Sequence, residues 1–434
     1  MMLILFLLVR YPFALAVLAL FLPMEAPGVG AAIAGSFGIL VPLIYAGYFL
    51  AVFKTLHTLW IRRNTSIVSR RVFQIALLAA GASGWIALSM FSSDASKIET
   101  IYTSLGAIPG VIFALAYYNN RSARIVLVSA VAVHLIVGCG IIVFPHSPLS
   151  FLRQPTSAGA ALPDVWRMET TGYKDSAQFE SAAQLAFYAA VGLIVGISLL
   201  LYHRGTLIRV LGTCLAGLGI AATFFTLERG VWIGIFVGLI ALIAPLKRKP
   251  AGKLVYAVIL STLALGVLAV CTSADNFVLV ALRDHFLAVR QDGYRIPVAM
   301  RSMDILIAKP LFGVGGQILD LIDLAGGAPH QSFYFYAVTY GIPTGVCVAA
   351  MTWLSLVTNF AKRRPPHGSG LTQYDRLLGR TLGLVVVAMA LTNGMSGGML
   401  GWAFLGFACL PWAHSLPAGR PVASNCPASA YSRT

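Results

Sequence analysis

The feature that most constrains this chain is a series of long apolar runs separated by short polar loops. About 20 apolar residues are needed to cross the hydrocarbon core of a bilayer, and roughly twelve runs approach that length. They occupy residues 3–23, 31–55, 72–91, 100–118, 125–144, 181–202, 210–226, 231–246, 254–272, 331–358, 381–398 and 399–415. No repeat of fixed period and no linker rich in proline or serine divides them. We therefore expect residues 1–434 to form one all-α, polytopic membrane domain.

The composition also favours a membrane protein over a soluble one. Of the 434 residues, 58% are hydrophobic and 11% are charged, whereas soluble domains carry about 25% charged residues. In a soluble chain the net charge of +16 would suggest nucleic acid as a partner. Here the cations gather in short loops between apolar runs, which is the pattern of membrane topology. We therefore expect membrane lipids, and no nucleic acid, as partners. The six cysteines lack CxxC spacing and are expected to be small buried hydrophobes.

The charges in the loops predict how the chain is oriented. With a cytoplasmic N-terminus, five loops face the cytoplasm: 61–71, 119–124, 203–209, 247–253 and 361–380. They hold 17 Lys and Arg residues and one acid, Asp375, while the other 14 acids fall in the opposite loops. Lys and Arg in short loops favour the cytoplasmic side. Residues 361–380 are thus expected to form a basic cytoplasmic loop. The first run is expected to be an uncleaved span, because no basic segment precedes it.

The longest polar segment, residues 274–330, is expected to lie on the outer side and to carry part of the functional site. Cations on that side run against the usual bias and so suggest a function. Five lie in this segment: Arg283, Arg290, Arg295, Arg301 and Lys309. A second outer loop, residues 145–180, is either a surface loop or a lid over the membrane face, since loops of this length are often functional.

Two local structures are predicted inside the segment 274–330. A helix from Ile296 to Ala308 begins directly after Arg295. Arg301 lies six residues beyond Arg295, so the two arginines face different directions and need not act on one group. For Arg301, contact with lipid phosphates is the favoured interpretation. The glycines after Pro310 (Gly313, Gly315 and Gly316) predict a tight turn, which lacks the Gly-Lys-Ser/Thr of a nucleotide-binding loop.

Arg229 is a further cation expected on the outer side. It lies between the apolar runs 210–226 and 231–246, with no room for a long loop, so it is held at the ends of two helices. Such an arginine can extend to the membrane surface and pair with Glu228. It can also bind an anionic substrate, because its planar guanidinium matches phosphate oxygens bidentately. The residues alone leave both interpretations open, although ionisable groups at a membrane edge are often functional.

His330 follows Pro329 and precedes the apolar run 331–358. It is either an interfacial residue at a helix start or a general base, since an unperturbed histidine titrates near ~6.5. By itself, the pattern favours the interfacial residue. No H-E-x-x-H, G-x-S-x-G or paired acidic motif occurs, which argues against zinc hydrolases and serine hydrolases.

Three pieces of the sequence surround these candidates in a fixed order. They are Leu227-Glu228-Arg229-Gly230, then Tyr294-Arg295 followed by Lys309-Pro310-Leu-Phe-Gly313-Val-Gly315, and last His330-Gln331 running into Tyr340-Gly341-Ile342-Pro343. Together they resemble the O-antigen ligase and polymerase superfamily of bacterial envelope glycosyltransferases, and the ligases most closely. The resemblance covers residues 220–350. The chain departs from the family pattern at Glu228, Ala299 and Gln331, where that pattern has Ser, Trp and Asn.

The resemblance implies a GT-C-like glycosyltransferase of the bacterial inner membrane that is inverting and needs no metal and no cofactor. The donor would be a glycan on undecaprenyl diphosphate, presented at the periplasmic face, and the acceptor would be lipid A–core oligosaccharide. Arg229 and Arg295 would hold the diphosphate and stabilise the charge that develops as it leaves. His330 would deprotonate or orient the acceptor hydroxyl. Further candidates for binding the diphosphate or the acceptor are Arg290, Arg301, Gly313, Gly315 and Gln331.

The sequence does not specify the acceptor. Ligation onto lipid A–core is the first choice because the outer loops are modest, and polymerisation of lipid-linked repeat units is the second. Transfer to a protein hydroxyl ranks third, since no additional soluble outer domain is evident. A membrane transporter of an anionic solute is the alternative from a different class. Many transporters show inverted repeats with broken helices, and no matched pair of interrupted spans is found here.

Overall fold

The computed structural model describes residues 67–91, 121–144, 146–149, 182–203, 205–226, 228–248, 292–315, 331–360 and 373–392, together with 257, 261, 321, 324–326, 329 and 405. Within this part of the chain all regular structure is helical and there is no strand, so the all-α prediction is confirmed there. The elements are α5 (Ile67–Phe91), α7 (Arg121–Val143), α10 (Ala182–Tyr202), α11 (Thr206–Thr226), α12 (Arg229–Ile243), the 3-10 turn η2 (Ala244–Arg248), α15 (Asp292–Ala308), α17 (Ser332–Tyr340), α18 (Ile342–Phe360) and α19 (Gln373–Thr392).

The described helices follow the predicted apolar runs. Two of them, Ala183–Tyr202 and Thr206–Thr226, are long and apolar enough to cross a membrane, and five described segments are shorter apolar helices. The runs 3–23, 31–55, 100–118, 254–272 and 399–415 lie outside the described residues, apart from single positions. The total of about twelve spans therefore stays a prediction.

The run 331–358 is not one helix, as expected, but two, because the chain breaks at Gly341 between α17 and α18. Gly341 has a φ of 97°, a conformation that side chains rarely adopt. A Cβ at this position would also overlap the carbonyl oxygen of Leu311. In α18, Gly345 lies against the backbone of Phe333 and Ala337, so α18 folds back along α17.

Two other helices begin earlier than predicted. α15 starts at Asp292 rather than at Ile296. The structure has one more turn, Asp292 to Arg295, before the predicted start. α19 starts at Gln373, so the last residues of the predicted loop 361–380 are helical.

Glycines let α10 and α11 pack closely in antiparallel order. Gly196 of α10 faces Gly212 and Ala216, and a Cβ there would lie 2.5 Å from the Ala216 nitrogen. Gly219, later in α11, faces Ala189, earlier in α10. Small residues at such contacts are typical of helix pairs in membranes, because they allow the two backbones to approach.

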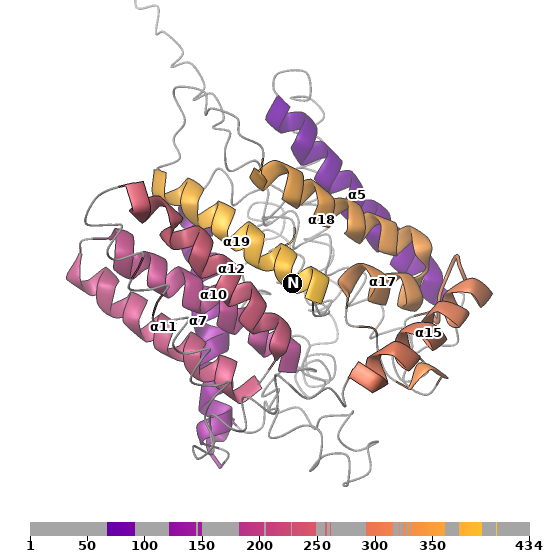
Figure 1. Ribbon diagram of the computed structural model, residues 1–434, viewed down its shortest axis with the longest axis horizontal. Helices are drawn as coiled ribbons and strands as arrows, with labels where there is room; N and C mark the ends of the chain where they lie inside the picture. The colour runs from indigo at the N-terminus through magenta and orange to yellow at the C-terminus, as the bar shows by residue number, and fades with distance from the viewer. Residues whose placement is uncertain are drawn as a thin grey trace, which may run out of the picture.

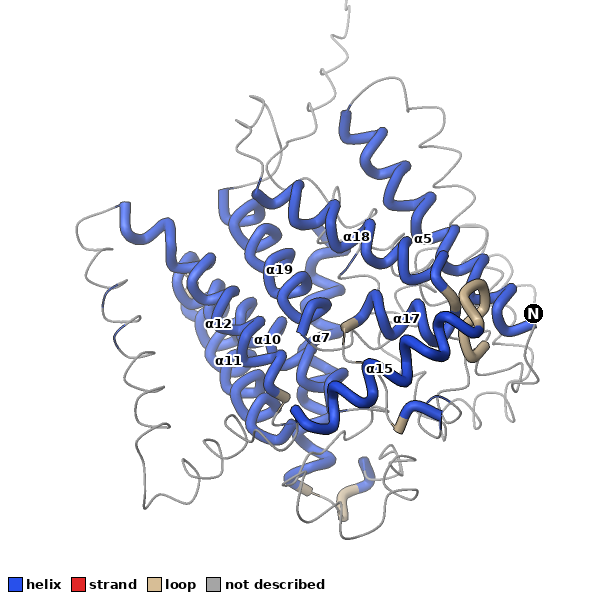
Figure 2. The backbone as a smooth tube through the Cα atoms, turned by 45° about the vertical axis from the view of Figure 1, so that its right-hand side comes forward, coloured by secondary structure: helices blue, strands red, loops and turns tan. Residues whose placement is uncertain are grey.

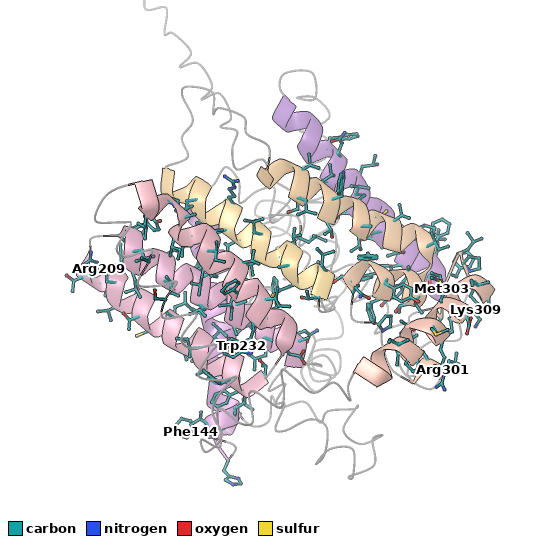
Figure 3. All side chains as sticks on the ribbon, viewed as in Figure 1. Phe144, Arg209, Trp232, Arg301, Met303 and Lys309 are labelled. Carbon is teal, nitrogen blue, oxygen red and sulfur yellow. The ribbon has the colours of Figure 1, made fainter. Side chains whose placement is uncertain are left out.

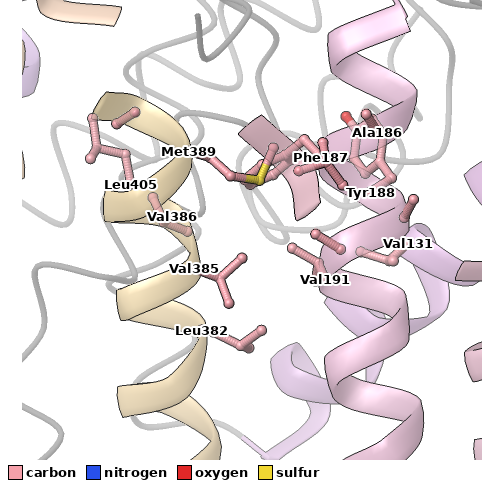
Figure 4. Close-up of a cluster of buried hydrophobic side chains, with 14 of the residues drawn as sticks. Val131, Ala186, Phe187, Tyr188, Val191, Leu382, Val385, Val386, Met389 and Leu405 are labelled. Atoms are coloured by element: carbon pink, nitrogen blue, oxygen red, sulfur yellow. The ribbon is translucent and has the colours of Figure 1, made fainter. Parts of the chain in front are cut away.

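α12 and α19 pack in the same way. Gly234 of α12 faces Met389, and one turn later Gly238 faces Val385, so these two helices are also antiparallel. Figure 4 shows Met389 pointing from α19 toward Phe187 of α10 and Val385 pointing toward Val191. These side chains belong to the main hydrophobic core, to which α5, α7, α10, α11, α12, α17, α18 and α19 all contribute.

The helices share one end, which contains Arg229 and which we call the Arg229 end. α12 begins and α11 ends there, and antiparallel α19 ends there as well. In Figure 1 this is the lower right end of each helix, where α18 begins and α5 ends. The opposite end carries the basic residues Arg209 and Arg248. This distribution of residues between the two ends agrees with the topology that the loop charges predict. Which end faces the periplasm stays a prediction.

α15 and α17 form a small layer at the Arg229 end (Figure 2). Between them lies a second hydrophobic cluster, made of the buried residues Val314, Leu321, Ala325 and Val338. Ile305 and Leu306 of α15 and Tyr334 and Phe335 of α17 pack against it. Apolar contacts therefore attach α15 to α17 separately from the main core.

Candidate functional site

Two of the three candidate catalytic residues lie at the starts of helices, and the third precedes the start of another helix in the sequence. Arg229 is the first residue of α12, and Arg295 lies in the first turn of α15. His330 itself is outside the described residues, and α17 begins two positions after it, at Ser332. Figures 1 and 2 show that α12, α15 and α17 each begin at the end nearer the middle of the molecule. The fold thus directs three helix starts toward one region.

Helix starts favour negative charge. The first backbone N–H groups of a helix lack intrahelical partners, and the aligned peptide dipoles place about half a positive charge there. At α17 the residue that precedes the helix is Gln331, whose side chain is exposed and makes no capping hydrogen bond. This start is therefore not closed by its own cap residue, and the arrangement suits an anionic ligand.

The connection between α11 and α12 is as short as predicted. α11 ends at Thr226 and α12 begins at Arg229, with Glu228 in an extended conformation before it. The rings of Phe224 and Trp232 pack edge to face across the connection, with centroids 5.4 Å apart. Figure 3 shows Trp232 at this end of the pair and Arg209 at the far end. The backbone of Arg229 is therefore held in place by the two helices that flank it.

The predicted tight turn after Pro310 is confirmed. Residues 310–315 form consecutive turns, and Gly313 and Gly315 have φ values of 60° and 72°. A Cβ at Gly313 would overlap the carbonyl oxygen of Val338 in α17. The next N–H, that of Val314, donates to this same carbonyl at 3.1 Å. Close packing on α17 thus explains the glycine at 313, and a contact between Gly313 or Gly315 and substrate stays a prediction.

α5 holds this turn from the other side. The indole N–H of Trp85 donates to the carbonyl of Leu311 at 2.6 Å. The hydroxyl of Ser89 donates to the carbonyl of Phe312 at 2.7 Å. The rings of Trp85 and Phe312 are also stacked, 5.7 Å apart. The N–H of Ile342, which begins α18, donates to the Pro310 carbonyl at 2.8 Å. The two hydrogen bonds from α5 could not be predicted, because nothing in an apolar run signals a partner more than 200 residues away.

Arg301 is described and exposed. Its Nη1 lies beside Gly326, 3.4 Å from where a Cβ of that residue would stand. Six residues separate it from Arg295, or about 9 Å along the helix axis, so it is not at the start of α15. Its neighbour Ser302 is buried, whereas Figure 3 shows Arg301 at the outer side of α15. This position agrees with contact to lipid phosphates.

The remaining candidates are described in part or not at all. For Arg229 and Arg295 the structure describes the backbone within α12 and α15. Arg290 and His330 lie outside the described residues. The catalytic and binding roles of all these residues therefore stay predictions, and the geometry supports them through the positions of the helix starts.

Comparison with known proteins identifies one family. Residues 214–349 match the family model of O-antigen ligase, and neither a curated protein nor a solved structure matches the chain. The matched range contains α12, α15, α17 and every candidate site residue, whereas α5 lies outside it. The match supports a glycosyltransferase of the O-antigen ligase or polymerase type. The predicted resemblance over residues 220–350 is thereby confirmed, since residues 214–349 match the O-antigen ligase family model.

Proposed function

We propose that this protein transfers an O-antigen glycan from undecaprenyl diphosphate onto lipid A–core oligosaccharide. The reaction would take place at the periplasmic face of the bacterial inner membrane and would belong to lipopolysaccharide assembly. The O-antigen ligase domain supports the reaction type. The observation that carries the proposal is the arrangement of α12, α15 and α17, whose starts are turned toward one region.

The proposed chemistry is a displacement at the anomeric carbon. The acceptor hydroxyl oxygen attacks the anomeric carbon of the donor glycan, and the bond between this carbon and the diphosphate oxygen breaks. The attack is a single displacement on the face opposite the diphosphate, so the new glycosidic bond forms with inversion. His330 takes the hydroxyl proton. The diphosphate leaves as an anion, and Arg229 and Arg295 stabilise its growing charge. A diphosphate is a good leaving group, so the step needs no general acid.

The helix starts contribute to the same stabilisation. Charge that develops on the leaving diphosphate meets the positive ends of α12, α15 and α17 together with the two guanidinium groups. These dipoles are fixed by the fold before the reaction begins, so they need no reorganisation in the transition state. The short α11–α12 connection and the close packing of the turn 310–315 keep the helix starts in place.

The acceptor is tested by reconstitution. Purified protein in lipid nanodiscs is incubated with glycan-linked undecaprenyl diphosphate, with and without lipid A–core, and the products are identified by mass spectrometry. A ligase forms glycosylated lipid A–core only when that acceptor is present. Longer lipid-linked glycans without lipid A–core would instead show a polymerase. If the donor is left unconsumed under both conditions, the proposed function is wrong. Uptake of an anionic solute into sealed vesicles that contain the protein would then indicate a transporter.

A further inference from the structure

We propose that Tyr334 is a positioning residue, whose hydroxyl fixes the start of α15 relative to the start of α17. The phenolic O–H of Tyr334 in α17 donates to the backbone carbonyl of Ala299 in α15 at 2.7 Å. This side chain–backbone hydrogen bond joins the two helices directly. The inference rests on the proposed function, because it assigns the bond a role in arranging the residues that carry out transfer.

Each end of this bond lies four residues after a candidate catalytic residue in the sequence. Ala299 lies four residues, or one turn, after Arg295. Tyr334 lies four residues after His330. The bond therefore connects the turn that follows the candidate diphosphate ligand to the turn that follows the candidate base. A shift or rotation of α15 relative to α17 would therefore change the distance between Arg295 and His330.

The backbone of α15 makes such an anchor useful. Pro297 lies inside the helix, two residues before Ala299. A proline has no N–H, so one intrahelical hydrogen bond, to the carbonyl of Gly293, cannot form. The first turn, which holds Arg295, is consequently attached to the rest of α15 by one bond fewer. The Tyr334 hydroxyl binds α15 directly after this weak point, and a carbonyl oxygen with two lone pairs can accept it beside the helical bond.

The hydroxyl and the ring of Tyr334 have separate roles. The ring packs against the second hydrophobic cluster, together with Ile305 and Leu306 of α15. A Tyr334→Phe substitution retains this apolar contact and removes only the hydrogen bond. The substitution thus changes how precisely α15 is placed without removing the contact that attaches it.

The chain offers a matched control. Tyr202 in α10 donates from its hydroxyl to the backbone carbonyl of Leu242 at the end of α12, at 2.8 Å. This bond has the same chemistry and nearly the same length as the bond from Tyr334. It lies at the end of the helices opposite Arg229. Tyr202→Phe therefore removes an equivalent bond from a place where it positions no candidate residue.

The test measures kcat and the KM for the lipid-linked donor in reconstituted protein, together with thermal unfolding. Misplacement of a reacting group by about 1 Å can cost on the order of 100-fold in rate. We expect Tyr334→Phe to lower kcat by about 10- to 100-fold while the KM for the donor changes little. Each substitution removes one hydrogen bond, so both variants should lower the unfolding temperature by similar amounts. Tyr202→Phe should leave kcat unchanged.

Each outcome decides the inference. Equal kcat values for Tyr334→Phe and the wild type would overturn it, and so would an equal loss of kcat in both variants, since that would show a general effect of stability. If the wild type consumes no donor, the proposed function fails. The role of the bond is then tested by a structural measurement, the distribution of distances between spin labels on α15 and α17. Tyr334→Phe should broaden this distribution and Tyr202→Phe should not. An unchanged distribution in Tyr334→Phe would overturn the positioning role as well.

Discussion

Trp85 and Leu311 lie 226 positions apart in the chain, and the indole N–H of the first donates to the carbonyl of the second at 2.6 Å. One turn after Trp85, Ser89 repeats this contact on the next carbonyl, that of Phe312. α5 lies outside the matched O-antigen ligase range, whereas both carbonyls lie within it. The N-terminal part of the chain thus helps to hold a turn of the domain that carries the candidate site.

Removing the Ser89 hydroxyl should destabilise the protein. Ser89→Ala removes one of two donors to the carbonyl of Phe312, which still accepts from the N–H of Gly315 at 3.2 Å, and a typical hydrogen bond contributes about 0.5–1.5 kcal/mol. The unfolding temperature, measured in detergent or nanodiscs, should fall. Ser83→Ala is the control on the same helix, because the Ser83 hydroxyl is buried without a hydrogen-bond partner among the described residues. That variant should be neutral or slightly stabilising, and an equal loss in both would contradict the role of the Ser89 bond.

Gly341→Ala should disturb the junction of α17 and α18. Gly341 has φ 97° and ψ 159°, a region that is nearly restricted to glycine and costs about 1–3 kcal/mol for other residues. The added Cβ would also overlap the carbonyl of Leu311, so we expect a clear fall in the unfolding temperature. Gly217→Ala in α11 is the control, because a Cβ there has no atom within 4 Å. It should leave stability unchanged or raise it by about 0.5–1 kcal/mol.

Arg229→Lys should slow transfer. A lysine keeps the charge but replaces the bidentate guanidinium with a single ammonium group. Loss of a donor to a developing anion costs about 100- to 1,000-fold, and because the charge remains we expect a smaller loss, about tenfold in kcat. Arg209→Lys makes the same change at the opposite end of α11, where Arg209 donates from Nε to the His203 carbonyl at 2.9 Å. Unchanged kinetics in Arg229→Lys would favour an arginine that only reaches the lipid surface.

His330→Ala should remove transfer while the protein still inserts into membranes and folds. A positioned general base contributes about 100- to 10,000-fold to a rate, so product formation should fall by that amount. Size-exclusion behaviour and thermal unfolding verify the fold. His203→Ala serves as the control, because the backbone carbonyl of that residue, rather than its ring, accepts the bond from Arg209. Activity of His330→Ala at the wild-type level would exclude the imidazole as the base.

Chelation should leave the activity unchanged. In the proposed reaction the guanidinium groups of Arg229 and Arg295, with the helix starts, neutralise the diphosphate in place of a divalent cation. Transfer assayed with excess EDTA should therefore match transfer without it. Loss of activity in EDTA, followed by recovery on addition of Mg²⁺ or Mn²⁺, would show that a metal ion carries part of this role.

Hydrophobic patterns were sufficient to predict the helices but not how they meet. The short connection before Arg229 and the turn after Pro310 could be predicted, because apolar run length and glycine placement are local signals. The break at Gly341 was missed, although Pro343 follows it closely. The run around it is apolar throughout, so hydropathy does not change at the break. The bond from Tyr334 to Ala299 depends on how two helices pack, and a sequence pattern carries no information about that contact.

The fold-back of α17 along α18 has a consequence for how the two substrates meet. α17 has nine residues, which amounts to about 14 Å of helix. Its first residue therefore lies up to that distance back from the Gly341 turn, toward the interior of the bundle. In a chain oriented as proposed, the hydroxyl group of the acceptor sugar has to reach the start of α17 before it can react. The start of α17, rather than the Gly341 turn, therefore sets the depth at which donor and acceptor meet in the proposed reaction.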